Sequence, residues 1–288
     1  MNDEPPAIYG IIGNPLDHTL SPLMHNAAFK ALKVNAVYQP FPIEEDELKL
    51  FIEDLKENDN PIYGLNVTIP YKEKILQFMD GANVFAEKVG AVNTIVINRS
   101  RKLFGYNTDG PGFLAHLKES GFSPEGKRIA ILGAGGTTRA ILSSLTLFDE
   151  RPESIRLYNR TLSTAKELLE DLSCRLDMSL VEVVPTIDDL NIELADCLIN
   201  TTSVGLKPTD ECLVDPDMLH KGLFVYDVIY NPKQTKLLKL AKEKGAKTAN
   251  GLGMLYYQGV LSLQHWANAE LDDKVKSAMR RALDKGAK

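Results

Sequence analysis

Cysteine is scarce in this sequence of 288 residues, and the few cysteines form no recognisable pattern. The three cysteines are odd in number and widely spaced, with no C-x-x-C pair (Cys174, Cys197 and Cys212). A disulfide framework needs an even set, and a redox or zinc motif needs close pairs. We therefore expect inert thiols in a protein of the reducing cytoplasm.

An excess of positive charge and long apolar runs are lacking as well. Lysine and arginine number 33 against 39 acidic residues, a net charge of −6, whereas a nucleic-acid-binding domain is usually basic. No apolar run approaches the length of a membrane span, and the first residues contain no apolar core of a signal peptide. Neither carboxylate clusters nor ligand spacing accompany the histidines (His18, His25, His116, His220 and His265). These absences predict a protein that binds no nucleic acid, no membrane and no metal.

What the sequence does contain is typical of a globular α/β enzyme. It is 44% hydrophobic and 25% charged, which are ordinary values for such proteins. Beyond residue 160, strand and helix patterns alternate, as a parallel sheet requires. We predict an α/β fold of two domains: a first α/β domain in residues 1–108 and a Rossmann-type, doubly wound nucleotide domain in residues 109–250. Residues 251–288 are predicted to be helices that return to the first domain.

A strand, a glycine turn and a helix follow one another in residues 127–148. The apolar strand Ile129–Leu132 runs into a turn formed by Gly133, Ala134, Gly135 and Gly136. This is the dinucleotide-binding arrangement: the glycines let the main chain approach a pyrophosphate, and the first helical turn holds its charge. Thr138 stands where a third glycine is usual, and the small Ala140 allows close packing of helix on strand.

The end of the next predicted strand indicates which dinucleotide is bound. Ser154–Tyr158 is followed by Asn159, Arg160 and Thr161. A cofactor with a free ribose 2′-hydroxyl would call for Asp or Glu here, whereas the planar cation of Arg160 suits a 2′-phosphate. We predict NADP; a solvated arginine at a strand end is the alternative. A later strand ends in hydroxyls that commonly flank a nucleotide, Thr202 and Ser203.

Lys72 and Asp109 are best suited to acid–base chemistry at a carbonyl. Each follows a predicted strand, and Lys72 is placed at the opening of a helix, where its charge opposes the helix dipole. Carbonyl reduction puts negative charge on oxygen, so the site needs a proton donor or a cation. The lysine would donate, and the carboxylate would orient it or share the proton. A surface lysine and an Asx turn before Gly110 are the alternatives.

Uncharged hydrogen-bonding side chains stand at the ends of several predicted elements around this pair: Thr19, Ser21, Asn66, Thr68, Asn93 and Gln258. As a set they suit a polyhydroxylated substrate. Ser21 before Pro22 also predicts a helix start with the serine hydroxyl as N-cap. Hydroxyls at this helix start would suit a substrate carboxylate.

Taken together, these motifs resemble the shikimate dehydrogenase family, and they occur in order along nearly the whole chain. The matching segments are 13–26 (GNPLDHTLSPLMHN), 66–72 (NVTIPYK), 90–94 (GAVNT), 107–110 (NTDG), 133–136 (GAGG), 159–161 (NRT), 202–203 (TS) and 251–255 (GLGML) with Gln258.

The resemblance implies two α/β domains hinged about a cleft and NADPH-dependent reduction of 3-dehydroshikimate to shikimate in aromatic amino-acid biosynthesis. Lys72 and Asp109 match the family's catalytic pair, and residues 159–161 match the segment that holds the 2′-phosphate. Gly253 of the GLGML motif is assigned to the cofactor. The substrate-contacting positions are matched by Ser21, Asn66, Thr68, Asn93 and Gln258, with Tyr230 near the site.

Two departures from the family pattern leave alternatives open. Thr19 stands where serine is usual, and Thr164 stands where a second arginine is frequent, with Lys166 as the nearest further cation. The first alternative is a quinate/shikimate dehydrogenase with relaxed cofactor use. The second is a non-catalytic shikimate-binding regulator on the same fold. For the oligomeric state we expect a monomer or a homodimer.

Overall fold

The structure is a computed structural model that describes residues 5–17 and 19–287, so His18 lies outside the described residues. The chain forms two compact units: the first contains Met1–Gly112 and Leu255–Gly286, and the second contains Phe113–Met254. The predicted boundaries, after residues 108 and 250, fall a few residues before these divisions. The assignment of a separate role to each domain stays a prediction.

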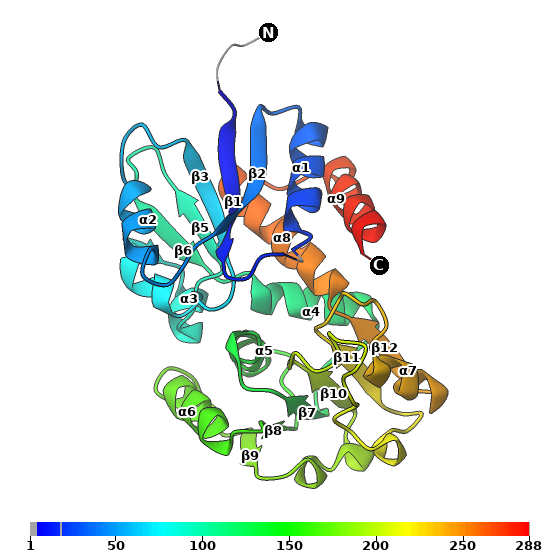
Figure 1. Cartoon of the computed structure of the whole chain (residues 1–288). Coiled ribbons are helices and arrows are strands. Elements are labelled where there is room, and N and C mark those ends of the chain that lie inside the picture. Colours follow the sequence, from blue (N-terminus) through cyan, green and yellow to red (C-terminus); the bar gives the residue numbers. More distant parts are fainter. Residues whose placement is uncertain (1–4, 18, 288) are drawn as a thin grey trace. The chain divides into compact units, whose positions relative to one another are not determined.

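The first unit is built on a six-stranded mixed sheet with the order β2-β1-β3-β5-β6-β4 (Figure 1). The strands are β1 (Ala7–Gly13), β2 (Ala36–Pro42), β3 (Ile62–Val67), β4 (Gly81–Ala82), β5 (Thr94–Ile97) and β6 (Leu103–Tyr106). β1 pairs in parallel with β2 and β3, whereas β5 is antiparallel to β3 and β6. β2 is an edge strand, as its prolines predict, because proline cannot donate to a second neighbour.

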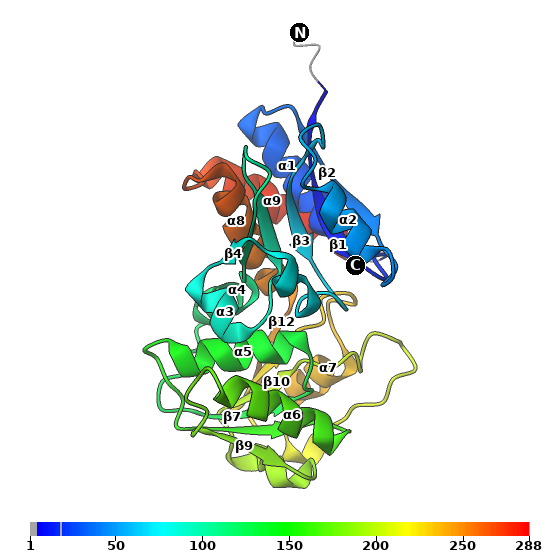
Figure 2. The same ribbon diagram turned by 90° about the vertical axis from the view of Figure 1, so that its left-hand side faces the viewer.

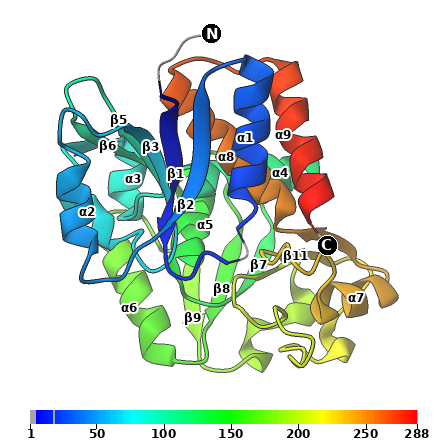
Figure 3. The same cartoon turned by 45° about the horizontal axis from the view of Figure 1, so that its top comes forward.

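Helices cover both faces of this sheet. One face carries α2 (Leu48–Asp54), the 3-10 helix η1 (Lys74–Phe78) and α3 (Val84–Val89), whose apolar side chains join those of β1, β3 and β5 in one core. The other face carries α1 (Ser21–Leu32), most of α8 (Leu252–Ala267) and α9 (Asp273–Gly286). Figure 3 shows α1 beside α9, on the opposite side of the sheet from α2. The C-terminal helices therefore complete the first unit.

The second unit contains six parallel strands in the order β12-β11-β10-β7-β8-β9. They are β7 (Arg128–Leu132), β8 (Ser154–Tyr158), β9 (Val181–Val184), β10 (Cys197–Asn200), β11 (Phe224–Asp227) and β12 (Lys247–Asn250). Counted within the unit, this is the doubly wound order of dinucleotide-binding domains, as predicted. The order reverses between β7 and β10, so a ligand is expected at the carboxyl ends of these two strands.

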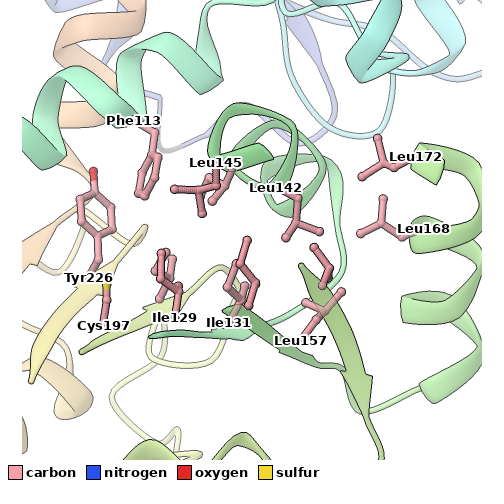
Figure 4. Packing of buried hydrophobic residues seen from close by; sticks show 14 of the residues in the cluster. Phe113, Ile129, Ile131, Leu142, Leu145, Leu157, Leu168, Leu172, Cys197 and Tyr226 are labelled. Carbon is pink, nitrogen blue, oxygen red and sulfur yellow. The ribbon is translucent and has the colours of Figure 1, made fainter. Parts of the chain in front are cut away.

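Helices also pack on both faces of the second sheet. α5 (Gly136–Leu147) and α6 (Leu162–Ser173) lie on one face (Figure 2). Their leucines meet Ile129, Ile131 and Leu157 of the sheet, with Phe113 of α4 (Asp109–Glu119) beside Tyr226 (Figure 4). α7 (Lys236–Glu243) covers the other face with Leu237 and Leu238. This packing fixes β7, α5 and β8, the elements that frame the glycine turn.

Several local predictions were wrong. Ser21 is the first residue of α1 and not its cap; the cap position is Leu20, and the Thr19 hydroxyl accepts the Ser21 amide at 3.3 Å. The amphipathic pattern of residues 44–56 predicts a helix over that range, but the structure forms the shorter α2, because residues 45–47 form turns. Lys72 precedes the short η1, so it does not oppose a helix dipole. The apolar segment 90–97 predicts a strand that begins at Gly90, but β5 begins at Thr94, because Gly90 caps α3 with φ 71°.

Membrane-spanning helices and clustered metal ligands are both absent from the residues that the structure describes. None of the helices in these ranges has the length and apolar character to cross a membrane. Within the same ranges there is no group of three or more histidine, cysteine or carboxylate side chains placed to hold a metal ion.

Candidate active site

Lys72 and Asp109 form an ion pair inside the first unit. The lysine Nζ lies 2.7 Å from Asp109 Oδ2, and the two side chains are 14% and 9% exposed. The Lys72 carbonyl accepts the Val92 amide at 2.7 Å, and Asp109 begins α4, where a carboxylate is stabilised by the helix dipole. The Asn107 side chain accepts the Asp109 amide at 3.2 Å and holds the turn. An ammonium so placed can give a proton to a substrate oxygen beside it.

A buried network of amides and hydroxyls fixes Asn66 and Asn93. Tyr38 donates its hydroxyl to Asn66 Oδ1 at 2.8 Å, and the Asn66 amide nitrogen donates to Ser262 Oγ at 2.9 Å. Asn93 accepts the Thr108 amide at 2.7 Å and donates to the Thr108 hydroxyl at 2.9 Å. Because the partners differ for oxygen and nitrogen, the network decides which way each amide points. The two side chains therefore present fixed donors and acceptors.

The other predicted substrate residues of the first unit are placed as follows. Ser21 is buried at the start of α1 beside the half-buried Thr19. Thr68 follows β3. Its methyl group packs against Gly13, the last residue of β1, and a Cβ on Gly13 would lie 2.4 Å from Thr68 Cγ2. Gln258 is buried on α8 and donates to the Leu255 carbonyl at 2.8 Å, while its own backbone carbonyl accepts from Ser262.

Sequence reasoning missed the hydroxyls that support this network: Tyr38, Thr94, Thr108 and Ser262. Thr94 and Thr108 stand directly beside predicted residues in the GAVNT and NTDG segments. Ser262 is four residues after Gln258, so helical spacing puts both on one face of α8. The four-residue spacing from Gln258 was the signal in the sequence that could have identified Ser262. No local pattern could have shown that Ser262 pairs with Asn66, which is 196 residues away in the sequence.

The second unit contains a pocket of about 440 Å³ at the carboxyl ends of β7, β8 and β10. Its lining includes eight of the predicted cofactor residues: Gly133, Ala134, Gly135, Asn159, Arg160, Thr161, Thr202 and Ser203. Gly136 is not on the lining, because it is already the first residue of α5. Gly253 is not on it either: it is buried, and a Cβ there would lie 2.1 Å from the His116 ring. Close packing against His116 explains why this position is a glycine.

Thr138 and Thr201 hold the glycine turn in its shape. Gly133 has φ 104°, and a Cβ there would lie 2.5 Å from Thr201 Oγ1. The Thr138 hydroxyl donates to the Gly133 carbonyl at 2.9 Å and accepts the Gly135 amide at 3.2 Å. The two threonine oxygens lie 2.7 Å apart. The residue that replaces the usual third glycine thus ties the turn to the end of β10.

The segment after β8 fits a phosphate group. The Asn159 side chain donates to the Thr161 carbonyl at 2.9 Å and shapes the turn into α6. Arg160 and Thr161 are exposed, and in the described structure the Thr161 hydroxyl makes no capping hydrogen bond to the helix. An exposed guanidinium beside a helix N-terminus is suited to an anion. The residues present therefore fit a dinucleotide that carries a 2′-phosphate.

Tyr230 belongs to the second unit, in the loop that follows β11. Its side chain is half-buried, and burial raises the pKa of its hydroxyl above the ordinary value. At neutral pH it is a neutral donor and acceptor.

Known proteins similar to this chain were found by sequence and by structure, and the full-length matches cover nearly all of it. Residues 11–95 match the family model described as the shikimate dehydrogenase substrate binding domain. The shikimate dehydrogenase (NADP(+)) of Carboxydothermus hydrogenoformans is 44% identical over 278 residues, 95% of each chain. The crystal structure of shikimate dehydrogenase from Aquifex aeolicus matches with a TM-score of 0.87 and 38% identity, over 98% of this chain and 99% of that one. The shikimate 5-dehydrogenase of Thermus thermophilus, solved with NADP(H) and shikimate, matches with a TM-score of 0.81 and 32% identity, over 97% and 99%.

Proposed function

This chain belongs to the shikimate dehydrogenase family, and we propose that it catalyses the reversible NADPH-dependent reduction of 3-dehydroshikimate to shikimate. The reaction belongs to aromatic amino-acid biosynthesis. The observation that carries the proposal is the buried ion pair of Lys72 and Asp109, set among fixed neutral donors and acceptors in a chain similar over its full length to shikimate dehydrogenases.

In the proposed mechanism NADPH supplies the hydride, and the protein handles the proton. Lys72 Nζ donates a proton to the substrate oxygen as negative charge develops on it. Asp109 keeps the ammonium in position, and the neutral amine left after the transfer takes its replacement proton from water. In the oxidation direction the same pair removes the proton of the shikimate hydroxyl.

We assign substrate binding to neutral side chains that can pair with hydroxyls and a carboxylate. They are Thr19, Ser21, Asn66, Thr68, Asn93, Tyr230 and Gln258. The support is the network that orients Asn66 and Asn93, since a hydroxyl is recognised best by donors that do not have to reorganise. The lysine of the ion pair complements the substrate oxygen that changes charge.

We assign dinucleotide binding to the pocket of the second unit. The glycine turn, from Gly133 to Gly136, would hold the pyrophosphate, and residues 159–161 would hold the adenosine 2′-phosphate. Thr202 and Ser203 would flank the nucleotide at the carboxyl end of β10. Gly253, which packs against His116, is also assigned to the cofactor.

Further proposals concern the cellular location, the oligomeric state and the binding partners of the protein. We place it in the cytoplasm, which is supported by its cysteine composition. We expect a monomer or a homodimer that binds small molecules and no nucleic acid, in line with its net charge of −6.

Steady-state oxidation of shikimate and of quinate, each with NADP⁺ and with NAD⁺, tests the function. Of the four combinations, we expect strong activity only with shikimate and NADP⁺. Comparable rates with quinate or NAD⁺ would instead indicate the quinate/shikimate relative and point to Thr19 or Thr164. Binding of shikimate without turnover under any of the four conditions would indicate the regulator, although a sensor has no use for the buried Lys72–Asp109 pair.

A further inference from the structure

Asp227, the last residue of β11, is a fully buried carboxylate that the mechanism above does not use. Its hydrogen-bond partners among the described residues are neutral. Oδ1 accepts from the Asn200 amide and from the Ile229 backbone, each at 3.1 Å, and Oδ2 accepts the Thr235 hydroxyl at 2.6 Å. Burying a carboxylate among neutral groups is unfavourable by several kcal/mol unless hydrogen bonds compensate. A carboxylate at this position therefore calls for an explanation.

One side of Asp227 controls the loop that lines the dinucleotide pocket. Asn200 ends β10, and its amide nitrogen points to Asp227 while its oxygen accepts from Thr202 twice, from the backbone at 3.0 Å and from the hydroxyl at 2.7 Å. An amide rotated by half a turn would place its oxygen against the carboxylate and its nitrogen against the Thr202 amide. The Asp227 carboxylate, together with the Val204 carbonyl that accepts from the same nitrogen at 3.3 Å, thus selects the amide orientation that holds Thr202.

The other side of Asp227 controls the loop that carries Tyr230. Ile229 stands one residue before Tyr230 and donates its amide to Oδ1, and Thr235 caps α7 while donating its hydroxyl to Oδ2. Both ends of the loop are thereby fixed to one side chain.

We propose that Asp227 is a positioning residue for the dinucleotide, acting through Asn200 on Thr202 and Ser203, and that it holds the Tyr230 loop in register with that edge of the pocket. The inference rests on the proposed function, because it takes the 440 Å³ pocket as the NADP site. It assigns to Asp227 no contact with substrate or cofactor.

Two substitutions separate the acceptor role of Asp227 from its charge. Asp227→Leu keeps the approximate size and removes both carboxylate oxygens, so the Asn200 nitrogen loses its shorter hydrogen bond and keeps the 3.3 Å bond to the Val204 carbonyl. Asp227→Asn keeps one oxygen that can accept from Asn200 and Ile229, and its nitrogen can donate to the Thr235 hydroxyl. We expect the leucine variant to raise the Kd of NADP⁺ about tenfold, equivalent to about 1.4 kcal/mol, and the asparagine variant to remain within about threefold of the parent.

The Kd of NADP⁺ is measured by calorimetry in the absence of shikimate, so that the dinucleotide step is seen alone. Thr235→Val is the matched control, because it removes a hydrogen bond of the same carboxylate but leaves Asn200 untouched; its Kd should stay within about twofold. If Asp227→Leu does not fold, Thr202→Val removes the hydrogen bond between the Thr202 hydroxyl and Asn200, the next contact after the one between Asp227 and Asn200. This variant should raise the Kd about threefold.

A folded Asp227→Leu protein, or a Thr202→Val protein, with a parental Kd would overturn the proposal. So would an equal loss in Asp227→Asn, since charge and not acceptor geometry would then be the cause. A parent protein that does not bind NADP⁺ at all would instead contradict the proposed function, so the two failures are distinct.

Discussion

The two units prepare their proposed binding surfaces in opposite ways. In the first, the residues assigned to the substrate are mostly buried side chains, and hydrogen bonds to other side chains hold Asn66 and Asn93. In the second, the residues assigned to the dinucleotide are a glycine turn and side chains that are largely exposed, among them Arg160, Thr161 and Ser203. The proposed substrate surface is therefore made largely of core side chains, whereas the proposed dinucleotide surface is made largely of exposed residues in loops at the edge of the sheet.

This difference predicts how each surface responds to substitution. Removing a member of a buried network leaves its partners unsatisfied, at about 1–3 kcal/mol each, so ligand affinity and stability should fall together. Removing an exposed cation leaves the fold intact and should change ligand affinity alone. The following experiments test this contrast, from the largest expected effect to the smallest.

Lys72→Ala should have the largest effect on activity. Loss of the proton donor should lower kcat by roughly two to four orders of magnitude, the range of general acid–base catalysis, and change the KM of shikimate much less. Lys74→Ala is the matched control, because Lys74 lies two residues on and forms an exposed ion pair with Glu45. Near-parental kcat in the Lys72 variant would remove this residue from the mechanism.

Arg160→Ala should weaken NADP⁺ binding about thirtyfold, since a charge-assisted hydrogen bond to phosphate contributes about 2 kcal/mol. The Kd of NAD⁺, which has no 2′-phosphate, and the melting temperature should not change. Lys166→Ala shows whether the nearest further cation compensates for Thr164: a loss as large as that of Arg160→Ala would assign the phosphate contact to both residues. Equal losses for NADP⁺ and NAD⁺ would exclude a 2′-phosphate role for Arg160.

Ser262→Ala should raise the Kd of shikimate about tenfold and lower the melting temperature. Its hydroxyl lies 2.9 Å from the Asn66 amide nitrogen and 2.8 Å from the Thr94 hydroxyl, and both would lose a buried partner. The Kd of NADP⁺ in the same protein is the internal control and should stay parental. An unchanged melting temperature would mean that the network is not part of the core.

His25 should have the smallest effect at neutral pH and become visible only as a pH dependence of stability. It stacks on Tyr38 with ring centroids 4.4 Å apart, and neither ring nitrogen has a hydrogen-bond partner among the described residues. Burial lowers the pKa of His25 from 6.5 to about 3. The folded protein keeps this ring neutral, whereas the unfolded chain takes up a proton below pH 6.5. Stability is therefore lost as the pH falls from 6.5 towards 3.

The substitution His25→Phe removes this titration and keeps an aromatic ring against Tyr38. Between about pH 6 and 4, the free energy of unfolding of the parent should fall more steeply than that of the variant, by about 1.4 kcal/mol per pH unit. Denaturant unfolding at several pH values measures both slopes. Parallel slopes would mean that His25 titrates equally in the folded and unfolded states.

The same contrast explains how far the sequence could predict the structure. In the second unit the signals are local: a strand, a GAGG turn, a helix and a second strand ending in Asn159 and Arg160 lie within about thirty residues, as a βαβ unit requires. The strand order and most of the pocket lining follow from that unit. The role of Gly253 could not be read this way, since its neighbour His116 is distant in the sequence.

In the first unit the decisive partners are far apart, and local rules failed there. Asn66 meets Tyr38 and Ser262 through tertiary packing that no spacing along the chain encodes. Ser21 has the right residue type for an N-cap but is preceded by a turn in which Thr19 takes the hydrogen bond. The sequence suggests the pairing of Lys72 with Asp109 because each follows a predicted strand, but the distance between the two side chains could come from the structure alone.

The most direct test of the contrast is to titrate shikimate and NADP⁺ separately into the parent, Ser262→Ala and Arg160→Ala proteins. The expectation is that Ser262→Ala weakens shikimate binding and leaves NADP⁺ binding unchanged, and that Arg160→Ala does the reverse. Weakening of both ligands by either substitution would contradict it, because the two surfaces would then not be prepared independently.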